Sequence, residues 1–211
     1  MKSLNKLKIF LIIFAITIVL SCNNSDWILY RAGNDYFPLQ KGYWWQYESN
    51  GVYETVEVKG DTVAYGRPCI HLLRDFDDEF WIKDNDEIRK LEFRTKNYDG
   101  TEYPIQQAWL LQYRLPFILG NYWTESFTDT VLVLGDTYRI NQTITRKITD
   151  ITDLSVVAGM FIQTYKVEYY ETITINDSIE YYSGYEWFAP NVGLVKKIIN
   201  NVEKILVDYS Y

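Results

Sequence analysis

Apolar and polar residues alternate along most of the chain after residue 35, and short polar turns interrupt the alternation at intervals. β-Branched and aromatic residues dominate the alternating runs, as the pleated surface of a sheet favours. The turns are rich in Asn, Asp and Gly, and Asn-Gly between such runs is a strong hairpin signal. The predicted hairpins pair 43–48 with 52–58, 124–134 with 137–149, 164–175 with 179–188, and 192–199 with 204–209. Segments 68–74, 79–83 and 87–94 form a further meander.

Helical periodicity is weak throughout the chain. No long segment carries a clear stripe of apolar residues spaced 3.6 positions apart, so we expect little helix. Segment 107–114 is ambiguous, because its apolar run is compatible with either a helix or a strand. About ten or eleven strands joined by short turns predict an all-β fold. We expect a single large, curved antiparallel meander, a half-barrel or open barrel of about ten strands.

One motif occurs twice. Pro-x-x-x-Gly-x-x-Trp spans Pro38–Trp45 and again Pro116–Trp123. Proline fixes φ and glycine permits a positive φ, so each copy predicts a turn that redirects the chain into an aromatic strand. The two copies suggest two related halves of one sheet. Trp187 opens a third aromatic block, and we predict that Trp45, Trp123 and Trp187 are structural side chains packed on the core rather than ligand-stacking ones.

The first 22 residues follow a different pattern. A basic stretch with three lysines precedes an apolar run over 9–20, which ends in Val19-Leu20-Ser21-Cys22. This run fits the ~7–15 apolar residues of a signal peptide and falls short of the ~20 that cross a bilayer as a helix. The arrangement resembles the lipobox of bacterial lipoprotein precursors. The resemblance implies cleavage before Cys22 and acylation of Cys22, palmitate included. An uncleaved anchor and a secretory signal with a chance cysteine are the alternatives.

The chain then divides into a lipoprotein signal peptide at 1–21, a lipidated cysteine with its tether at 22–35, and an all-β domain at 36–211. Removing 1–21 leaves 18 basic against 28 acidic residues, a net charge of −10. Nucleic acid and anionic lipid repel so acidic a domain. We therefore expect no nucleic-acid partner, and membrane attachment through the N-terminal acyl chains alone. Cys69 is the only cysteine after Cys22, which excludes an intramolecular disulfide between two residues of the domain.

A second resemblance covers most of 36–198. The repeated motif, Val157-Ala158-Gly159-Met160-Phe161, Tyr165-Lys166-Val167 and the block 187–195 (Trp-Phe-Ala-Pro-Asn-Val-Gly-Leu-Val) are similar to a group of uncharacterised exported β-sheet lipoproteins, TapB-like and related domain-of-unknown-function families. Val157 stands where that group usually has Pro. The resemblance implies a curved antiparallel sheet and brings no catalytic residues with it. Together with the lipobox it predicts a lipid-anchored protein of the cell envelope, at the outer membrane and facing the periplasm or the cell surface.

Three patterns are candidates for chemistry. Cys69 and His71 share a face of a predicted strand and could be a nucleophile with its base or two metal ligands, but neither idea finds a third partner at a recognisable spacing. A half-buried Cys beside a hydrogen-bonded His is the structural alternative. The acidic segments 75–79 and 84–87 suit Ca²⁺ in composition, yet the EF-hand spacing fails, and Asp also favours solvated turns. Asp61-Thr62-Val63, Asp129-Thr130-Val131 and Asp177-Ser178-Ile179 resemble a short O-glycosylation acceptor.

The functional hypotheses differ in what the concave side of the sheet would hold. We expect a non-catalytic binding or structural module with no cofactor, no metal and no catalytic residues, whose partner is a hydrophobic ligand, a glycan or an envelope protein. A carrier or chaperone for lipid or lipoprotein would need a roomy apolar groove. A glycan-active enzyme would need a wet cleft with two carboxylates close together. A filled core with flat faces would indicate a structural role.

Overall fold

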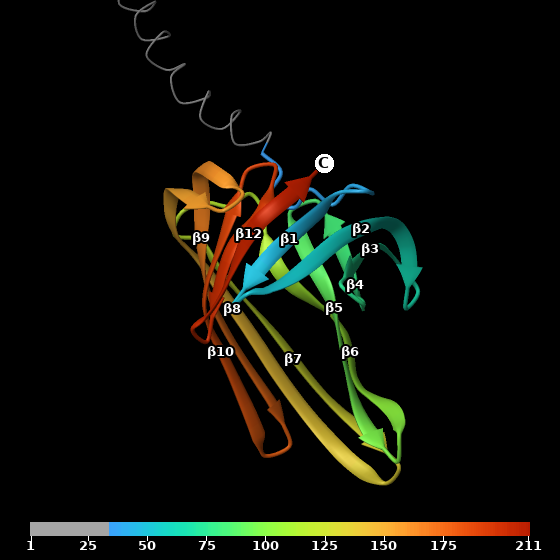
Figure 1. Cartoon of the computed structure of the whole chain (residues 1–211). Helices are drawn as coiled ribbons and strands as arrows, with labels where there is room; N and C mark the ends of the chain where they lie inside the picture. The colour runs from blue at the N-terminus through green and yellow to red at the C-terminus, as the bar shows by residue number, and fades with distance from the viewer. Residues whose placement is uncertain (1–33) are drawn as a thin grey trace, which may run out of the picture. The chain divides into compact units, whose positions relative to one another are not determined.

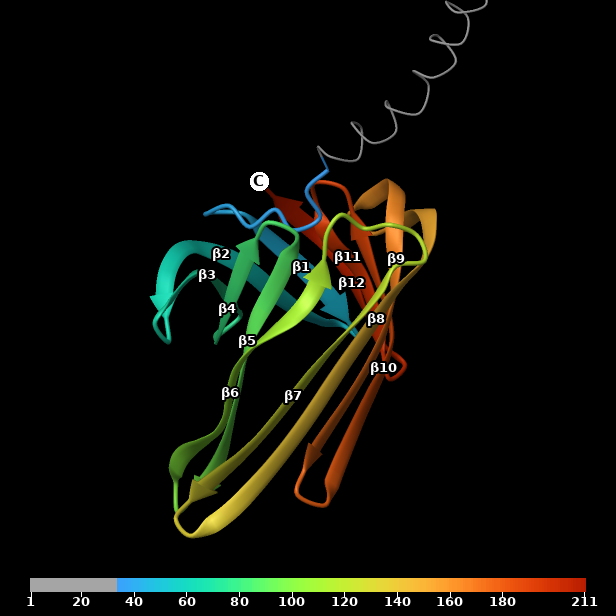
Figure 2. The ribbon, with the colours of Figure 1, turned by 180° about the vertical axis from the view of Figure 1, so that it is seen from behind.

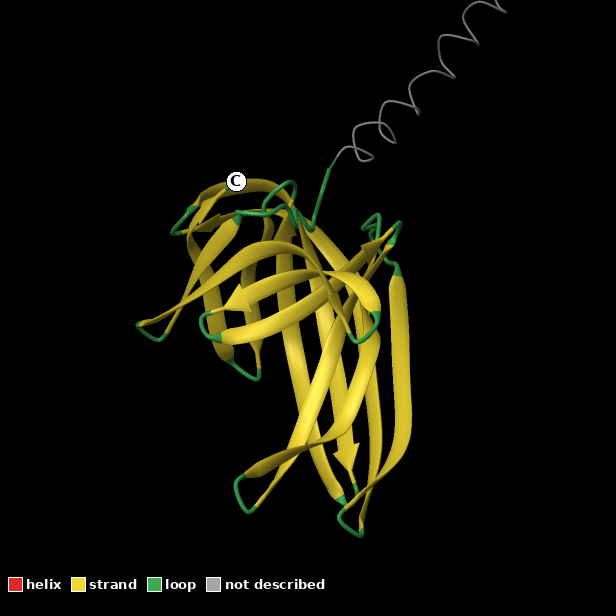
Figure 3. Ribbon diagram, turned by 90° about the vertical axis from the view of Figure 1, so that its right-hand side faces the viewer, coloured by secondary structure: helices red, strands yellow, loops and turns green. Residues whose placement is uncertain are grey.

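The computed structural model describes residues 34–211, and residues 35–211 form one compact unit by themselves. Residues 1–33, which include the predicted signal peptide, Cys22 and most of the tether, lie outside the described residues. Residues 34–211 contain strands and loops but no helix (Figure 3). Accordingly, no helix in the described part of the chain could span a membrane. The all-β prediction is confirmed, and the ambiguous segment 107–114 belongs to a strand.

Twelve strands follow one another along the chain. They are β1 (Trp44–Ser49), β2 (Val52–Ala64), β3 (Arg67–Arg74), β4 (Asp77–Asp84), β5 (Glu87–Tyr98), β6 (Thr101–Arg114), β7 (Tyr122–Val133), β8 (Asp136–Val156), β9 (Gly159–Ile175), β10 (Ser178–Ala189), β11 (Gly193–Ile199) and β12 (Val202–Ser210). The order in the sheet is β6-β5-β4-β3-β2-β1-β12-β11-β10-β9-β8-β7. The predicted antiparallel meander is confirmed, with twelve strands instead of about ten.

The largest gain in strand length over the prediction lies in β8. The alternation of apolar and polar residues predicted that the strand beginning at 137 ends at 149, but β8 continues to Val156. The register with β9 shifts between Ile148 and Asp150 and again between Thr152 and Leu154. Each irregularity breaks the two-residue period, and the end of this strand was therefore hidden in the sequence.

The sheet curves until its two edges meet. β1 pairs with β12, which joins the first and last strands of the meander (Figure 1). The edges β6 and β7 lie close together (Figure 2), where Trp123 Nε1 donates a hydrogen bond to the Gln112 carbonyl at 3.0 Å. Farther along, the Tyr98 hydroxyl donates to Asp136 at 2.7 Å. The sheet is thus a nearly closed barrel, in agreement with the predicted half-barrel or open barrel.

The two copies of the repeated motif form the same turn. The Gly42 N–H donates to the Val58 carbonyl at 2.9 Å, and the Gly120 N–H donates to the Ile148 carbonyl at the same distance. Both glycines have positive φ, +91° and +86°. That conformation favours glycine. In each case the turn leads into a strand that pairs with the strand accepting this bond, so the sequence repeat corresponds to a structural repeat.

Each of the three predicted structural tryptophans is buried. Trp45 Nε1 donates to the Val192 carbonyl at 2.7 Å, which ties β1 to the turn between β10 and β11. Trp123 ties the two edges of the sheet together as described above. Trp187 belongs to a core cluster that includes Phe161 of β9. Their effect on stability stays a prediction.

An aromatic cluster fills the end of the barrel where the chain enters the domain. Phe37 lies 4.7 Å from Tyr113 and 5.2 Å from Phe188, measured between ring centroids, and Phe117 lies 5.4 Å from Phe188. We call these four residues the aromatic plug. Asp35 fixes the entering segment, because its backbone N–H donates to Asn191 Oδ1 at 3.0 Å and its carboxylate contacts Lys83 Nζ at 2.7 Å. The plug closes off one end of the concave side.

Candidate binding cavity

The concave side of the sheet contains a cavity of about 320 Å³ next to the aromatic plug. This volume lies in the range of small-molecule sites, ~300–1,000 Å³. Its apolar and aromatic lining includes Phe37, Leu39, Trp45, Tyr47, Leu72, Trp81, Tyr113, Phe188 and Leu194. Its charged lining consists of Arg74, Glu79, Lys90, Glu92, Arg94, Arg146, Glu171, Glu186 and Lys197. An acyl chain needs an apolar lining, so this cavity suits a ligand with polar and charged groups.

The charged residues reach the cavity through the two-residue period of the strands. Lys90, Glu92 and Arg94 occupy alternate positions of β5, so all three point to the same side of the sheet. In the sequence, charged residues at alternate positions indicate a solvated face, and this site therefore gives no signal of its own there. Only the closure of the sheet by pairing of β1 with β12 turns that face into the wall of a cavity.

Glu79 holds one set of these charges together. It accepts from Arg74 Nε at 3.1 Å, from Lys90 Nζ at 2.8 Å and from the Trp81 indole at 3.1 Å. Burial alone would raise the pKa of Glu79, but the two cations outweigh burial and lower this pKa to about 2. Arg74 also bonds to Glu54. Both oxygens of Glu79 are thus occupied, and the carboxylate stays ionised at neutral pH.

Glu186 is the centre of a second group of charged side chains, and it is more deeply buried than Glu79. It accepts from Arg146 Nε at 3.3 Å and from the Tyr113 hydroxyl at 2.9 Å, and Lys197 Nζ lies 3.6 Å away. Burial acts to raise the pKa of Glu186, and Arg146 and Lys197 reverse this shift and lower it. Burial also lowers the pKa of Lys197, although its side chain keeps 38% of its accessible surface. Lys197 lines the cavity, and solvent still reaches its side chain.

Arg146 lies between two aromatic rings. Its guanidinium carbon is 4.3 Å from the ring centroid of Tyr113 and 4.6 Å from that of Tyr169. The residue is only 4% exposed. Within residues 34–211, its Nη1 has no hydrogen-bond partner. A buried guanidinium N–H without an acceptor costs free energy, ~1–3 kcal/mol or more for a charged group, unless a ligand atom supplies that acceptor.

Two further groups of the cavity are incompletely paired. Arg94 Nε is buried and has no hydrogen-bond partner among the described residues. Glu92 accepts one long bond, 3.4 Å from Gln112 Nε2, and burial raises its pKa. Arg94 and Arg146 thus offer donors to an acceptor, and Glu92 offers an acceptor or, when protonated, a donor. Unpaired donors and acceptors in the lining of one cavity are the arrangement that orients a small polar ligand.

Of the residues singled out in the sequence, Trp45 and Glu79 line the cavity, and the candidates for nucleophilic or metal chemistry lie outside it. Cys69 is buried, and burial raises the pKa of its thiol, which disfavours the thiolate that a nucleophile needs. His71 Nε2 lies 2.7 Å from Asp78 Oδ1, and its ring stacks on Phe80. Within the acidic segment 75–79, Glu79 lines the cavity, whereas Asp75 lies in the turn between β3 and β4 and accepts from the Thr55 N–H of β2 at 2.8 Å. Within residues 34–211, no group of three or more His, Cys, Asp or Glu is placed to hold a metal ion.

Comparisons with known proteins bear on the fold. No protein-family model matches the sequence, and no curated protein matches it. Two crystal structures are similar. One, from Parabacteroides distasonis ATCC 8503 and assigned as a lipoprotein, has a TM-score of 0.50 and 15% identity, and the match covers 84% of this chain and 99% of that one. The other, from Bacteroides fragilis NCTC 9343 and assigned as an exported protein with a YmcC-like fold, has a TM-score of 0.49 and 12% identity, and covers 84% and 100% of the two chains.

At 15% identity, the first of these similarities shows the fold and nothing further. It extends over nearly the whole of that protein, which agrees with the single curved sheet described above. The lipobox at Cys22 and the resemblance to TapB-like families stay predictions.

Proposed function

We propose that this protein is a non-catalytic binding lipoprotein of the cell envelope that holds a small ligand with an anionic group inside the barrel. The observation that carries the proposal is Arg146 Nη1, a buried donor without a partner on the wall of a cavity large enough for a ligand. A carboxylate, sulfonate or phosphate oxygen would satisfy it by a charge-assisted hydrogen bond. The aromatic and aliphatic wall around Trp45, Leu72 and Trp81 would contact the body of the ligand.

The chemistry of the lining favours this proposal over the two alternatives. A carrier of acyl chains would bury unpaired Arg94 and Glu92 against hydrocarbon, which is unfavourable for charged groups. A glycan-active enzyme would need two free carboxylates. Glu79 and Glu186 are instead fixed by cations, and both have lowered pKa values. Glu171 accepts from Gln142 Nε2 at 2.6 Å and from the Tyr169 hydroxyl. Among the described residues that line the cavity, Glu92 is thus the one incompletely paired carboxylate. We therefore assign no catalytic residue.

The location follows from the N-terminal pattern and is part of the proposal. Acyl chains on Cys22 would hold the domain at the outer membrane, facing the periplasm or the cell surface. Crystal structures of similar fold assigned as a lipoprotein and an exported protein are consistent with an envelope location. The net charge of −10 after removal of 1–21 leaves the acyl chains as the attachment to an anionic bilayer.

Two fluorescent probes of nearly the same shape test the binding proposal. Anilinonaphthalene sulfonate carries an anionic group on an aromatic body, and phenylnaphthylamine is the neutral analogue. Titrations of the chain from Asn23 onward, followed by energy transfer from Trp45 and Trp81, should give a sulfonate affinity at least ~10-fold tighter, about one charge-assisted bond. Equal affinities, or a tighter neutral probe, would favour the acyl carrier. No binding of either probe would contradict a ligand cavity.

A further inference from the structure

The outer face of β7–β10 has an unusual composition. Along these strands, residues that face the interior alternate with residues that face outward. The outward positions considered are Thr124, Ser126 and Thr128 on β7, Asn141, Thr143 and Thr145 on β8, Tyr170, Thr172 and Thr174 on β9, and Ile179, Tyr181 and Ser183 on β10. These outward positions hold Thr, Ser, Asn, Tyr and one Ile. None of them is charged, although charged residues make up 23% of the chain. We call this surface the hydroxyl face.

Cross-strand contacts hold the hydroxyl face in a regular array. The hydroxyl oxygens of Thr124 and Thr145 are 3.1 Å apart, and the Thr128 hydroxyl donates to Asn141 Oδ1 at 2.9 Å. Directly opposed residues on antiparallel strands have Cβ atoms ~4.5–5.5 Å apart, so such pairs repeat across and along the sheet. The face thus presents closely spaced hydroxyl groups in fixed positions.

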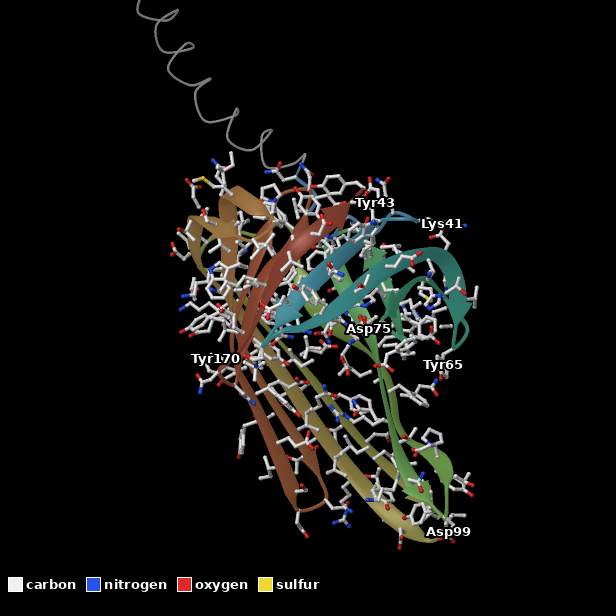
Figure 4. The ribbon with its side chains drawn as sticks, viewed as in Figure 1. Lys41, Tyr43, Tyr65, Asp75, Asp99 and Tyr170 are labelled. Atoms are coloured by element: carbon white, nitrogen blue, oxygen red, sulfur yellow. The ribbon has the colours of Figure 1, made fainter. Side chains whose placement is uncertain are left out.

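Three tyrosines form a line along one side of this face. Tyr170 faces Ser183 across the β9–β10 ladder, and Tyr181 and Tyr185 are therefore its diagonal neighbours, at ~7–8 Å. We call Tyr181, Tyr170 and Tyr185 the tyrosine row. Tyr181 is 67% exposed and Tyr170 is 51% exposed. Figure 4 shows Tyr170 at the outer edge of the ribbon, and its hydroxyl donates to Glu168 at 2.9 Å.

The surface is hollowed beside the tyrosine row. The hollow has a volume of about 430 Å³, and its lining includes Tyr170, Tyr185, Gly184 and the turn residues Asn200 and Asn201. A Cβ atom at Gly184 would lie 1.8 Å from a backbone carbonyl oxygen of β11, so only glycine permits this close approach of the two strands. Aromatic rings and amides around an uncharged hollow continue the chemistry of the hydroxyl face.

We propose that the tyrosine row and the hydroxyl face bind a neutral polysaccharide chain. Exposed tyrosine rings offer flat apolar surfaces with a polar hydroxyl, and the C–H faces of successive sugar rings can stack on them. The neighbouring Thr, Ser and Asn groups both donate and accept hydrogen bonds, as sugar hydroxyls do. Lys166 Nζ lies 3.9 Å from the ring centroid of Tyr185, but the outward positions of the hydroxyl face carry no cation, and the acidic domain repels an anionic polymer.

Affinity gel electrophoresis tests this proposal on the chain from Asn23 onward, whose residues 35–211 form a compact unit. The gels contain dextran, laminarin, xylan or galactomannan as neutral polymers, or polygalacturonate as an anionic one. At least one neutral polymer should retard the protein. Tyr170→Ala and Tyr181→Ala should each weaken the affinity derived from that retardation by ~3- to 10-fold, the loss expected of one aromatic stacking contact. Tyr53→Ala removes an equally exposed tyrosine from β2 and should migrate as wild type.

Every other outcome counts against the proposal. If no neutral polymer retards the protein, or if polygalacturonate retards it more strongly, then the ligand class is wrong. If Tyr170→Ala and Tyr181→Ala behave like Tyr53→Ala, then the tyrosine row is not the site. Tyr170→Ala and Tyr181→Ala should bind anilinonaphthalene sulfonate as wild type does, because the cavity lies on the opposite side of the sheet, and this measurement separates failure here from failure of the proposed cavity function.

Discussion

Removal of Trp123 should destabilise the domain more than almost any other single truncation. Trp123 is 6% exposed, and its indole N–H closes the gap between the edge strands β6 and β7 by donating to the Gln112 carbonyl. Trp→Ala in a core costs ~3–5 kcal/mol. Trp123→Phe keeps most of the buried ring but leaves the carbonyl without its donor, at ~1–3 kcal/mol. A domain has ~5–15 kcal/mol in total, so the alanine variant removes a large share.

Urea unfolding of the chain from Asn23 onward measures these losses. With a slope of ~2 kcal/mol per M, Trp123→Ala should lower the unfolding midpoint by about 2 M. Trp45→Ala and Trp187→Ala should behave similarly, because both residues are buried in the core cluster around β1, β9 and β12. Tyr122→Ala, at a 74% exposed neighbour, is the matched control. If the free energies of unfolding of all three tryptophan variants lie within ~0.5 kcal/mol of the wild-type value, the substitutions behave as neutral surface changes, and the structural role is refuted.

Three further predictions concern the anchor, the ion pairs and the thiol. Cys22→Ala should move the protein to the soluble fraction and abolish the mobility change on processing; a variant that stays in the membrane would contradict the lipobox. Glu79 has a folded pKa of about 2 against an ordinary 4.5, so its stabilisation, on the order of 3 kcal/mol, is full above pH 4.5 and is lost as the pH falls towards 2. Glu79→Gln should flatten the stability profile between pH 5 and pH 2, and an unchanged slope would rule out this linkage. Burial raises the pKa of Cys69, so its alkylation by iodoacetamide should be slow until urea is added; equal rates in both states would show an exposed thiol.

The sequence contained most of the fold, because the sheet is built from local hairpins. Turn residues marked where strands end, and Asn50, Asn176 and Asn200 do adopt positive φ in those turns. The repeated Pro-x-x-x-Gly-x-x-Trp motif predicted two equivalent turns, and Gly42 and Gly120 form them with equivalent hydrogen bonds. Such signals act within a few residues of one another and can therefore be read without knowing the rest of the fold.

The cavity could not be predicted in this way. Its existence depends on pairing of Trp44 with Ser210, at opposite ends of the domain, for which no local pattern exists. Arg146 sits in a strand where threonines alternate with other residues, and this mixture suggested one solvated face. That face is the outer one, and Arg146 points inward to Glu186. Charged residues inside a barrel have the same spacing as charged residues in water, so the period alone cannot separate them.

The most direct test of the account is the pair of probe affinities in Arg146→Gln. The variant removes the unpartnered Nη1 and should weaken anilinonaphthalene sulfonate at least ~10-fold, while phenylnaphthylamine binds as in wild type and so reports an intact cavity. Arg139→Gln, on the exposed side of the same strand, should change neither affinity. Sulfonate affinity that survives in Arg146→Gln would contradict recognition of an anionic group by Arg146.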